Sequence, residues 1–146
     1  MADGYRQDQG RGADPGLREA LGRVGDRWTL LLVSALLGGP RRFNELQADV
    51  GGIAPNVLSQ RLRQLEADHL VVSHPYTDRP VRHAYALTAT GAALAGALRL
   101  LASWGAEQGA DPVVHEACGT ATEARWWCPT CDRMVEDDEL DDLRWL

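Results

Sequence analysis

The first half of the chain places apolar residues at helical spacing in four short segments, each bounded on at least one side by glycine or proline. Asp26 can cap the second helix, Gly38-Gly39-Pro40 ends it, Gly51-Gly52 stops the third, and Pro55 suits the first turn of the fourth. The apolar stripes are Leu17, Leu21 and Val24; Trp28, Leu31, Leu32 and Ala35; Phe43, Leu46 and Val50; and Leu58, Leu62 and Leu65. Two amphipathic helices joined by a short glycine turn are typical of a helix-turn-helix.

After the fourth helix the pattern becomes extended. Leu70-Val71-Val72 is β-prone, and the segment from Thr77 to Pro80 indicates a turn. Apolar and polar residues then alternate from Val81 to Leu87, the period of a half-exposed strand. The spacing therefore predicts a β-hairpin, or wing. Thr88 can cap a last long helix with one apolar stripe, and residues 109–112 indicate a linker.

All three cysteines of the chain lie in one short segment near its C-terminus. His115 and Cys118 form one pair with two residues between them, and Cys128 and Cys131 form a second pair after nine intervening residues. Two such pairs can complete a tetrahedron of thiolates and imidazole, which zinc prefers. A closed set of four ligands leaves no position for water, so we predict a structural zinc in a small zinc-ribbon-like knuckle. A redox dithiol and residues with no joint role are the alternatives.

The charge is unevenly distributed. The formal net charge is −6. Residues 17–108 hold ten arginines and eight acids, whereas residues 109–146 hold three arginines and ten acids. The body is thus mildly basic, and the acidic run from Glu136 to Asp142 is expected to be a solvated helix face. Every basic residue is an arginine, whose planar fork suits phosphate and guanine.

No apolar run is long enough to span a bilayer, and the polar first sixteen residues lack the apolar core of a signal peptide. We therefore expect a cytoplasmic protein with no membrane contact. A reducing compartment favours a metal or redox role for the C-x2-C pair over a structural disulfide.

Several motifs, in order, resemble those of HxlR-type transcriptional regulators. They are residues 25–31 (GDRWTLL), 42–46 (RFNEL), 58–66 (LSQRLRQLE), 80–91 (PVRHAYALTATG) and 104–105 (WG). The match runs from about Leu17 to Gln108, roughly two-thirds of the chain. The resemblance implies a homodimeric winged helix-turn-helix of the broader MarR-like kind that binds double-stranded DNA. The terminal helices would form the dimer interface, and two recognition helices would enter successive major grooves of a pseudo-palindromic operator.

The chain departs from the family pattern at several places. Many members carry a cysteine just before the first helix, but residues 13–16 here are ADPG, so thiol sensing at that place is excluded. Ala54 stands where serine would cap the recognition helix, and His69 stands where glycine often ends it. The knuckle after Pro112 lies outside the core pattern.

The expected architecture is mainly α with a small β-hairpin wing (α+β), a winged helix-turn-helix followed by the small zinc-ribbon-like element. Residues 1–14 are expected to form a flexible N-terminal tail. Residues 15–108 would form the winged helix-turn-helix DNA-binding and dimerisation domain, and residues 109–146 an acidic C-terminal extension with the zinc knuckle.

The candidate DNA contacts fall into three groups. The recognition helix opposes its inward leucines with polar side chains that can bind adenine or guanine. Two arginines precede the third helix and two lie on the wing, where phosphate or the minor groove is within reach. The candidates are Asn56, Ser59, Gln60 and Arg63; Arg41 and Arg42; and Arg79 and Arg82. The alternative for each is an ordinary solvated side chain, and Arg61 is expected to face the flank of the helix and pair with an acid.

Trp28 and Trp104 are expected in the core or the dimer interface, with an unknown small-molecule effector between them at the dimer seam as the alternative. No set of nucleophile and base suggests catalysis elsewhere, so we expect a regulator and not an enzyme. Two rival interpretations stay open. One is a winged helix used only for protein contacts, and the other is a thiol redox or zinc-responsive protein that acts through Cys128 and Cys131.

Overall fold

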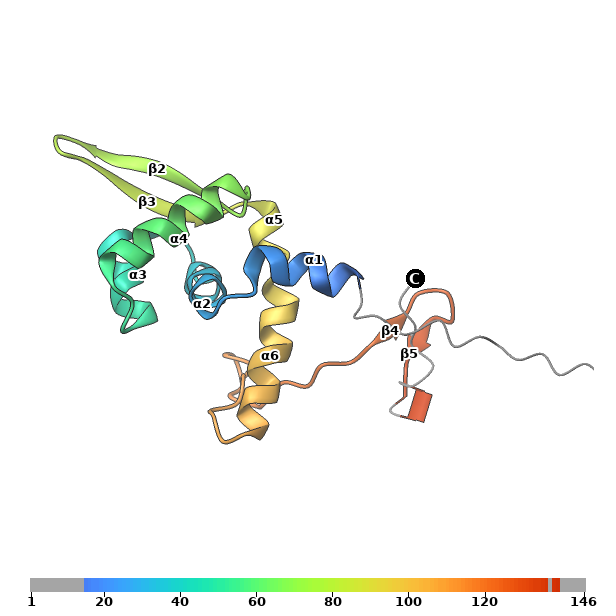
Figure 1. The fold of residues 1–146 in the computed structure, drawn as a ribbon. Helices are drawn as coiled ribbons and strands as arrows, with labels where there is room; N and C mark the ends of the chain where they lie inside the picture. Colours follow the sequence, from blue (N-terminus) through green and yellow to red (C-terminus); the bar gives the residue numbers. More distant parts are fainter. Residues whose placement is uncertain (1–14, 137, 140–146) are drawn as a thin grey trace, which may run out of the picture.

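The computed structural model describes residues 15–136, 138 and 139. Its elements are α1 (Pro15–Val24), α2 (Arg27–Leu36), β1 (Arg41–Arg42), α3 (Phe43–Val50), α4 (Pro55–Ala67), β2 (Val71–Asp78), β3 (Val81–Leu87), α5 (Ala89–Ala92), α6 (Ala95–Glu107), β4 (Trp127–Cys128) and β5 (Arg133–Met134). Figure 1 shows the winged helix-turn-helix that the sequence predicts, with the β2–β3 hairpin projecting from a group of helices. The predicted tail of residues 1–14 and most of the acidic run lie outside the described residues.

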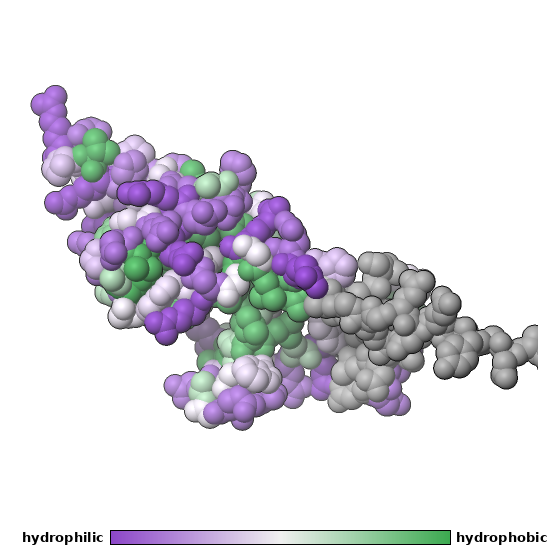
Figure 2. Space-filling model, viewed as in Figure 1, coloured by the Kyte–Doolittle hydropathy of each residue, from purple (hydrophilic) through white to green (hydrophobic). Residues whose placement is uncertain are grey.

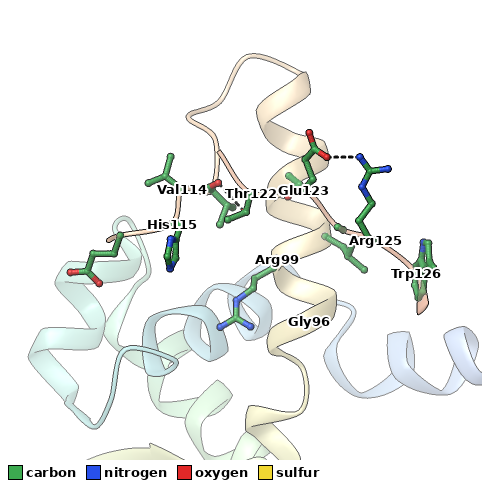
Figure 3. A pocket seen from close by; sticks show the side chains of 13 residues that line it. Gly96, Arg99, Val114, His115, Thr122, Glu123, Arg125 and Trp126 are labelled. Atoms are coloured by element: carbon green, nitrogen blue, oxygen red, sulfur yellow. Dashed lines mark hydrogen bonds and ion pairs between the residues drawn. The ribbon is translucent and has the colours of Figure 1, made fainter. Parts of the chain in front are cut away.

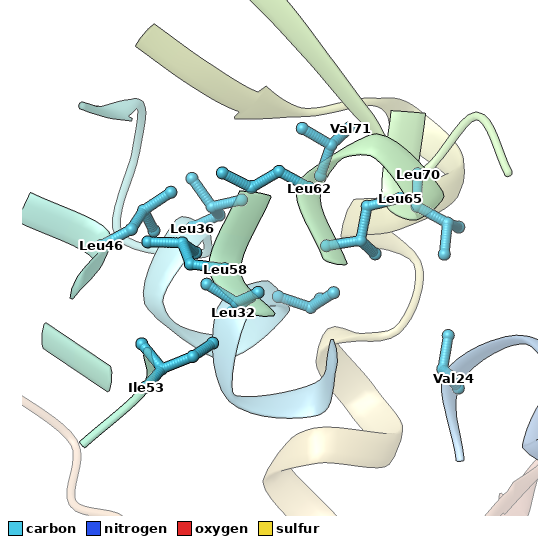
Figure 4. Close-up of a cluster of buried hydrophobic side chains, with 11 residues drawn as sticks. Val24, Leu32, Leu36, Leu46, Ile53, Leu58, Leu62, Leu65, Leu70 and Val71 are labelled. Atoms are coloured by element: carbon cyan, nitrogen blue, oxygen red, sulfur yellow. The ribbon is translucent and has the colours of Figure 1, made fainter. Parts of the chain in front are cut away.

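The hydrophobic core lies where α2, α3 and α4 meet the base of the wing (Figure 4). Leu58, Leu62 and Leu65 of α4 are all buried, as the sequence predicts. The predicted face of α2 is wrong in part, because Thr29, Leu32, Val33 and Leu36 are buried whereas Leu31 is 45% exposed. The α2 helix is therefore rotated relative to the sequence expectation, and Leu31 is left on the surface.

Asp26 ties the start of α2 to the recognition helix. Its carboxylate accepts hydrogen bonds from the amides of Trp28 (3.0 Å) and Thr29 (3.1 Å) and from the Thr29 hydroxyl. The Arg61 Nε atom of α4 lies 3.5 Å from the same carboxylate, which confirms that Arg61 pairs with an acid instead of facing outward. That contact is an ion pair without hydrogen-bond geometry, since the Nε atom has no hydrogen-bond partner.

Replacing Asp26 with alanine is expected to lower the free energy of unfolding by about 1–2 kcal/mol, the usual cost of a lost cap together with a half-exposed ion pair.

The stabilisation by Asp26 also depends on pH. Burial raises the pKa of Asp26, but the hydrogen bonds from Thr29, the Arg61 charge and the Trp28 amide together outweigh burial and leave the pKa lowered. The carboxylate's contribution is therefore present above the unfolded pKa, about 4, and is lost as the pH falls through the lower folded value. Urea unfolding at several pH values measures this. Asp26→Asn, which keeps a capping oxygen, should lose less, and an alanine variant as stable as the wild type at pH 7 would contradict the role.

The turn before α4 depends on backbone conformations that few residues adopt. Gly51 and Gly52 have φ values of 62° and 73°, which favour glycine. Ala54 is the N-cap and makes no side-chain cap hydrogen bond, while Pro55 occupies the first turn. His69, just past the end of α4, has a φ of 57°, a left-handed conformation at the position where the family often has glycine.

The wing is one part of a three-stranded sheet in the order β1-β3-β2. The β2 and β3 strands pair antiparallel, from Val71 opposite Leu87 to Asp78 opposite Val81. The sequence did not predict β1, in which Arg41 and Arg42 pair with Tyr85 and Ala84. This pairing fixes the start of α3 against the base of the wing.

The predicted last long helix is interrupted. Thr88 does cap a helix, through a 3.1 Å hydrogen bond from the Gly91 amide, but α5 ends at Ala92. The Leu94 amide then bonds to the carbonyl three residues back, at Gly91, before α6 begins. A Cβ atom on Gly91 would lie 2.1 Å from the Leu70 carbonyl oxygen, so α5 is held against the end of α4 while α6 turns away.

The C-terminal extension does not form the predicted zinc-ribbon-like element. Val114 and Ala121 form an isolated antiparallel bridge around the first ligand pair. The second pair lies in a separate hairpin, in which Trp127 pairs with Met134 and Cys128 with Arg133. The segment around Trp127 is thus a strand, and its partner β5 follows the second cysteine pair. None of the helices in the described part of the chain is long and apolar enough to cross a membrane.

Candidate nucleic-acid interface

The outward face of α4 presents a row of polar side chains. Asn56, Gln60 and Arg63 are exposed, while Ser59 is half-buried and less accessible. No hydrogen bond within the described chain engages the Asn56 or Gln60 side chains. Their amides therefore keep the donor and acceptor pair that binds adenine, and the Arg63 fork can bind guanine.

Arg63 also lies at the junction between α4 and the wing. Burial raises the pKa of Tyr85 on β3, and the charge of Glu66 adds to that shift while the charge of Arg63 opposes it. Arg63 is thus close enough to β3 to act on its tyrosine. The α4 helix also packs against β2, so its end lies next to the base of the wing.

The two arginines before α3 have different surroundings. Arg41 is engaged within the body, because its Nε atom donates to Asp49 at 3.2 Å and its Nη1 atom donates to the Pro40 carbonyl at 3.2 Å. Arg42 stacks its guanidinium on the Tyr76 ring of β2, 4.5 Å from the ring centroid, while its backbone amide donates to Glu45 at 2.6 Å. Arg42 is therefore held at the surface with its charge exposed, whereas Arg41 has its charge partly neutralised.

A cleft of about 440 Å³ is lined by residues from the start of α3 and from the wing. Its polar lining comprises Arg42, Asn44, Tyr76, Arg82, His83 and Tyr85. The sequence reasoning missed Tyr76, Asn44 and His83 as members of this site. The only sequence signal for Tyr76 is its aromatic side chain on a wing strand, because an aromatic ring can stack under a guanidinium.

Arg79 and Arg82 are exposed on the wing. Thr77 closes the turn between the strands, because its hydroxyl donates to the Pro80 carbonyl at 2.7 Å. Arg79 lies in this turn and Arg82 on β3, next to the cleft that holds Arg42. The structure thus brings Arg42 and Arg82 to one cleft and places Arg79 at the tip of the wing.

Replacing Arg82 with alanine is expected to weaken binding to all duplexes by a similar factor, because a phosphate contact carries no sequence information. The dependence of log affinity on log salt should become shallower by about 0.9 per lost contact, or about 1.8 for a dimer. Titrations of one duplex over a range of salt concentrations measure the slope. An unchanged slope in the variant would mean that Arg82 does not touch phosphate.

The first pair of predicted metal ligands forms a compact turn. The His115 Nδ1 atom lies 3.3 Å from the Cys118 Sγ atom. The backbone closes the turn through hydrogen bonds from the His115 amide to Thr120 (2.8 Å) and from the Gly119 amide to His115 (2.7 Å). Hydrogen bonds from the Thr120 side chain and amide lower the pKa of Cys118, which favours the thiolate that a metal needs.

The second pair forms at the tip of the β4–β5 hairpin. Hydrogen bonds from Cys131, and then from the Thr130 amide, lower the pKa of Cys128, while the interaction with Cys128 raises the pKa of Cys131. The two cysteine side chains are thus hydrogen-bond neighbours. Arg133 and Glu139 close the base of the hairpin through contacts of 2.5 and 2.6 Å.

The two pairs are not brought together within the chain. In the part of the chain that the structure describes, no three His, Cys, Asp or Glu side chains are close enough to hold one metal ion. Figure 1 shows the turn that follows α6 on one side of that helix and the β4–β5 hairpin on the other. Each pair suits zinc, but the arrangement of one chain does not fit the predicted four-ligand site.

A cavity of about 480 Å³ lies between α6 and the extension. Arg99 of α6 and His115 of the turn point into it, while Glu123 and Arg125 pair with each other at 2.7 Å (Figure 3). The two tryptophans of the predicted effector seam lie apart from it. Trp28 packs against the core, and the guanidinium carbon of Arg27 lies 4.1 Å from the centroid of the Trp28 ring. Trp104, in contrast, is 63% exposed.

The chain is similar to known transcriptional regulators over the whole body. A model of the HxlR-like helix-turn-helix family matches residues 23–112. An uncharacterized HTH-type transcriptional regulator of Mycobacterium tuberculosis (strain H37Rv) is 38% identical over 122 residues, which cover 80% of this chain and 77% of that protein.

Two solved structures resemble both the sequence and the fold. The redox regulator HypR in its oxidized form is 30% identical with a TM-score of 0.60, covering 66% of this chain and 98% of HypR. A candidate transcription factor from Pseudomonas aeruginosa is 29% identical with a TM-score of 0.67, covering 87% of this chain and 88% of that one. The chain therefore belongs to the HxlR-like helix-turn-helix family and is a DNA-binding transcriptional regulator.

Proposed function

We propose that the protein is a homodimer that recognises a specific operator through α4 and supports that contact with the wing. The observation that carries this proposal is the outward face of α4, where Asn56, Gln60 and Arg63 are exposed beside the basic cleft of Arg42 and Arg82. Side chains of α4 would read base edges in the major groove, and the wing arginines would hold phosphate or enter the minor groove. Arg41, which is paired with Asp49, would contribute less.

The homodimer is supported by an exposed apolar surface on the terminal helices. We call the side chains Leu17 and Leu21 of α1 and Leu101 and Trp104 of α6 the terminal-helix face; they are 53%, 54%, 54% and 63% exposed. Figure 2 shows hydrophobic residues along α6, where the surrounding surface is hydrophilic. An apolar surface of this kind usually marks a protein contact, and a second copy would cover it through a two-fold axis.

A selection of duplexes from a random DNA library tests the proposal. Enrichment of one pseudo-palindromic sequence, bound in preference to unrelated competitor DNA, is the expected result. Negligible affinity for every duplex would instead favour the rival in which the winged helix serves only protein contacts. A regulator of this kind acts where the chromosome lies, which in a bacterium is the cytoplasm, and the proposal assigns the protein no catalytic activity.

Two regulatory inputs belong to the same proposal. A structural zinc held by His115, Cys118, Cys128 and Cys131 would order the extension, since so short a segment builds little core of its own. A small-molecule effector has room in the cavity between α6 and the extension, whereas the Trp28–Trp104 seam would exist only in the dimer. The proximity of Cys128 and Cys131 favours a dithiol switch as the alternative to zinc. Zinc content and thiol alkylation of the purified protein distinguish the two.

A further inference from the structure

The extension contains two preformed halves of a metal site that one chain keeps apart. The His115–Cys118 turn is closed by its own backbone hydrogen bonds and lies against the α6 cavity. The Cys128–Cys131 pair belongs to the β4–β5 hairpin, which is closed by strand pairing and by the Val135 amide donating to Trp126 at 2.8 Å. Each half offers two ligands, and a tetrahedral zinc needs four.

A segment that we call the arm connects the two halves. It runs without helix or strand from Glu123 to Trp126 and joins the turn on one side of α6 to the hairpin on the other (Figure 1). Trp126, the last residue of this arm, and Trp127, the first residue of β4, are 52% and 54% exposed, although Trp126 lines the cavity. Two adjacent tryptophans seldom stay this exposed unless another surface covers them.

We propose that the zinc site is shared between two subunits, with His115 and Cys118 of each chain completed by Cys128 and Cys131 of a second copy. Leu101 and Trp104 of the terminal-helix face lie on α6, and Trp104 lines a cavity together with Glu123 and Arg125 of this arm, so a second copy seated there would be in reach of the hairpin. The exposed Trp126 and Trp127 would then be covered by the same contact. The inference rests on the proposed homodimer and the proposed zinc.

Sharing the ligands between two subunits still gives each zinc a full set of four. Each of the two sites in a dimer has three thiolates and one imidazole, and each cysteine thiol releases its proton to solvent as the metal binds. Because each ion bridges two chains, zinc binding and dimerisation favour one another by linkage. The site would thereby make the DNA-binding form dependent on zinc.

Mixed dimers of full-length protein test the sharing directly. One variant carries His115→Ala and Cys118→Ser, and the other carries Cys128→Ser and Cys131→Ser. Co-expression with two different affinity tags allows the mixed dimer to be purified, and its zinc is measured by elemental analysis beside native mass. The wild type is expected to hold two zinc ions per dimer, each variant alone none, and the mixed dimer one, because one of its sites keeps all four ligands.

The other outcomes separate the steps of the inference. Two zinc ions in the wild-type dimer with none in the mixed dimer would overturn sharing and show that each chain closes on its own metal. A wild-type protein without zinc would contradict the proposed zinc site. A zinc-loaded monomer would contradict the proposed homodimer. Either result would also rule out the shared site. If a double variant fails to fold, His115→Ala paired with Cys131→Ser gives the same comparison with one ligand removed from each chain, in the presence of a competing chelator.

Discussion

Arg63→Ala is expected to cause the largest loss of selective DNA binding of any single substitution on α4. Arg63 is exposed at the junction of α4 with the wing, where its fork can form two hydrogen bonds with one guanine. One such contact discriminates between bases by about 1–3 kcal/mol, and a dimer would make it twice. Competition titrations with the selected duplex and with unrelated DNA measure the effect, and the affinity for unrelated DNA should fall much less.

Arg18→Ala is the matched control, since it removes the same charge from an exposed position of α1, away from α4 and the wing. Its selectivity should equal that of the wild type. If Arg63→Ala and Arg18→Ala bound the selected duplex with equal affinity, the proposed base contact of Arg63 would be contradicted. The α4 face would then be an ordinary solvated surface.

Leu101→Glu is expected to separate the subunits. Leu101 is 54% exposed in the single chain, so the substitution costs the monomer fold little. In the dimer it would bury a carboxylate on the apolar terminal-helix face, near its own symmetric copy, and an unpaired buried charge is strongly destabilising. We expect sedimentation to report the mass of one chain, 16.0 kDa, at concentrations where the wild type has twice that mass. Affinity for a pseudo-palindromic operator should fall by about two orders of magnitude or more, because a monomer engages only one half-site.

Leu101→Ala is the graded control, because it removes apolar area without adding charge. It should weaken the dimer by less than the glutamate variant does. A Leu101→Glu protein that stayed dimeric and bound the operator normally would place the dimer contact elsewhere than on α1 and α6.

The helix-turn-helix could be predicted because local signals agree with tertiary packing there. Leu58, Leu62 and Leu65 repeat at helical spacing, and all three are buried. Gly51 and Gly52 mark a turn that needs positive φ, and Thr77 to Pro80 mark the wing turn. These features are encoded within short stretches of chain, so spacing alone identifies them.

The misplaced features depend on contacts between distant segments. Spacing placed Leu31 on the apolar stripe of its helix, but α2, whose cap Asp26 pairs with Arg61 of α4, buries Thr29 and Val33 instead. The break after α5 follows from the close approach of Gly91 to Leu70, which no periodicity reveals. Both effects arise only when segments far apart in the sequence meet.

The same reasoning applies to the candidate sites. Residue types predicted the outward face of α4, but the stacking of Arg42 on Tyr76 and the pairing of Arg41 with Asp49 could not be read from the sequence. The spacing of His115, Cys118, Cys128 and Cys131 predicted two ligand pairs, and within each pair the two side chains are neighbours in the structure. Spacing contains no information on the direction of the arm between them, which is why the zinc site stays a prediction.

Base-resolution footprinting on the selected duplex tests the central claim most directly. A dimer that reads DNA through two α4 helices should protect two half-sites of the pseudo-palindrome, with centres about one helical turn apart or a multiple of it, and Arg63→Ala should remove the protection at both. A single protected patch, or protection that is the same in the Arg63→Ala protein, would contradict recognition by a dimer through α4.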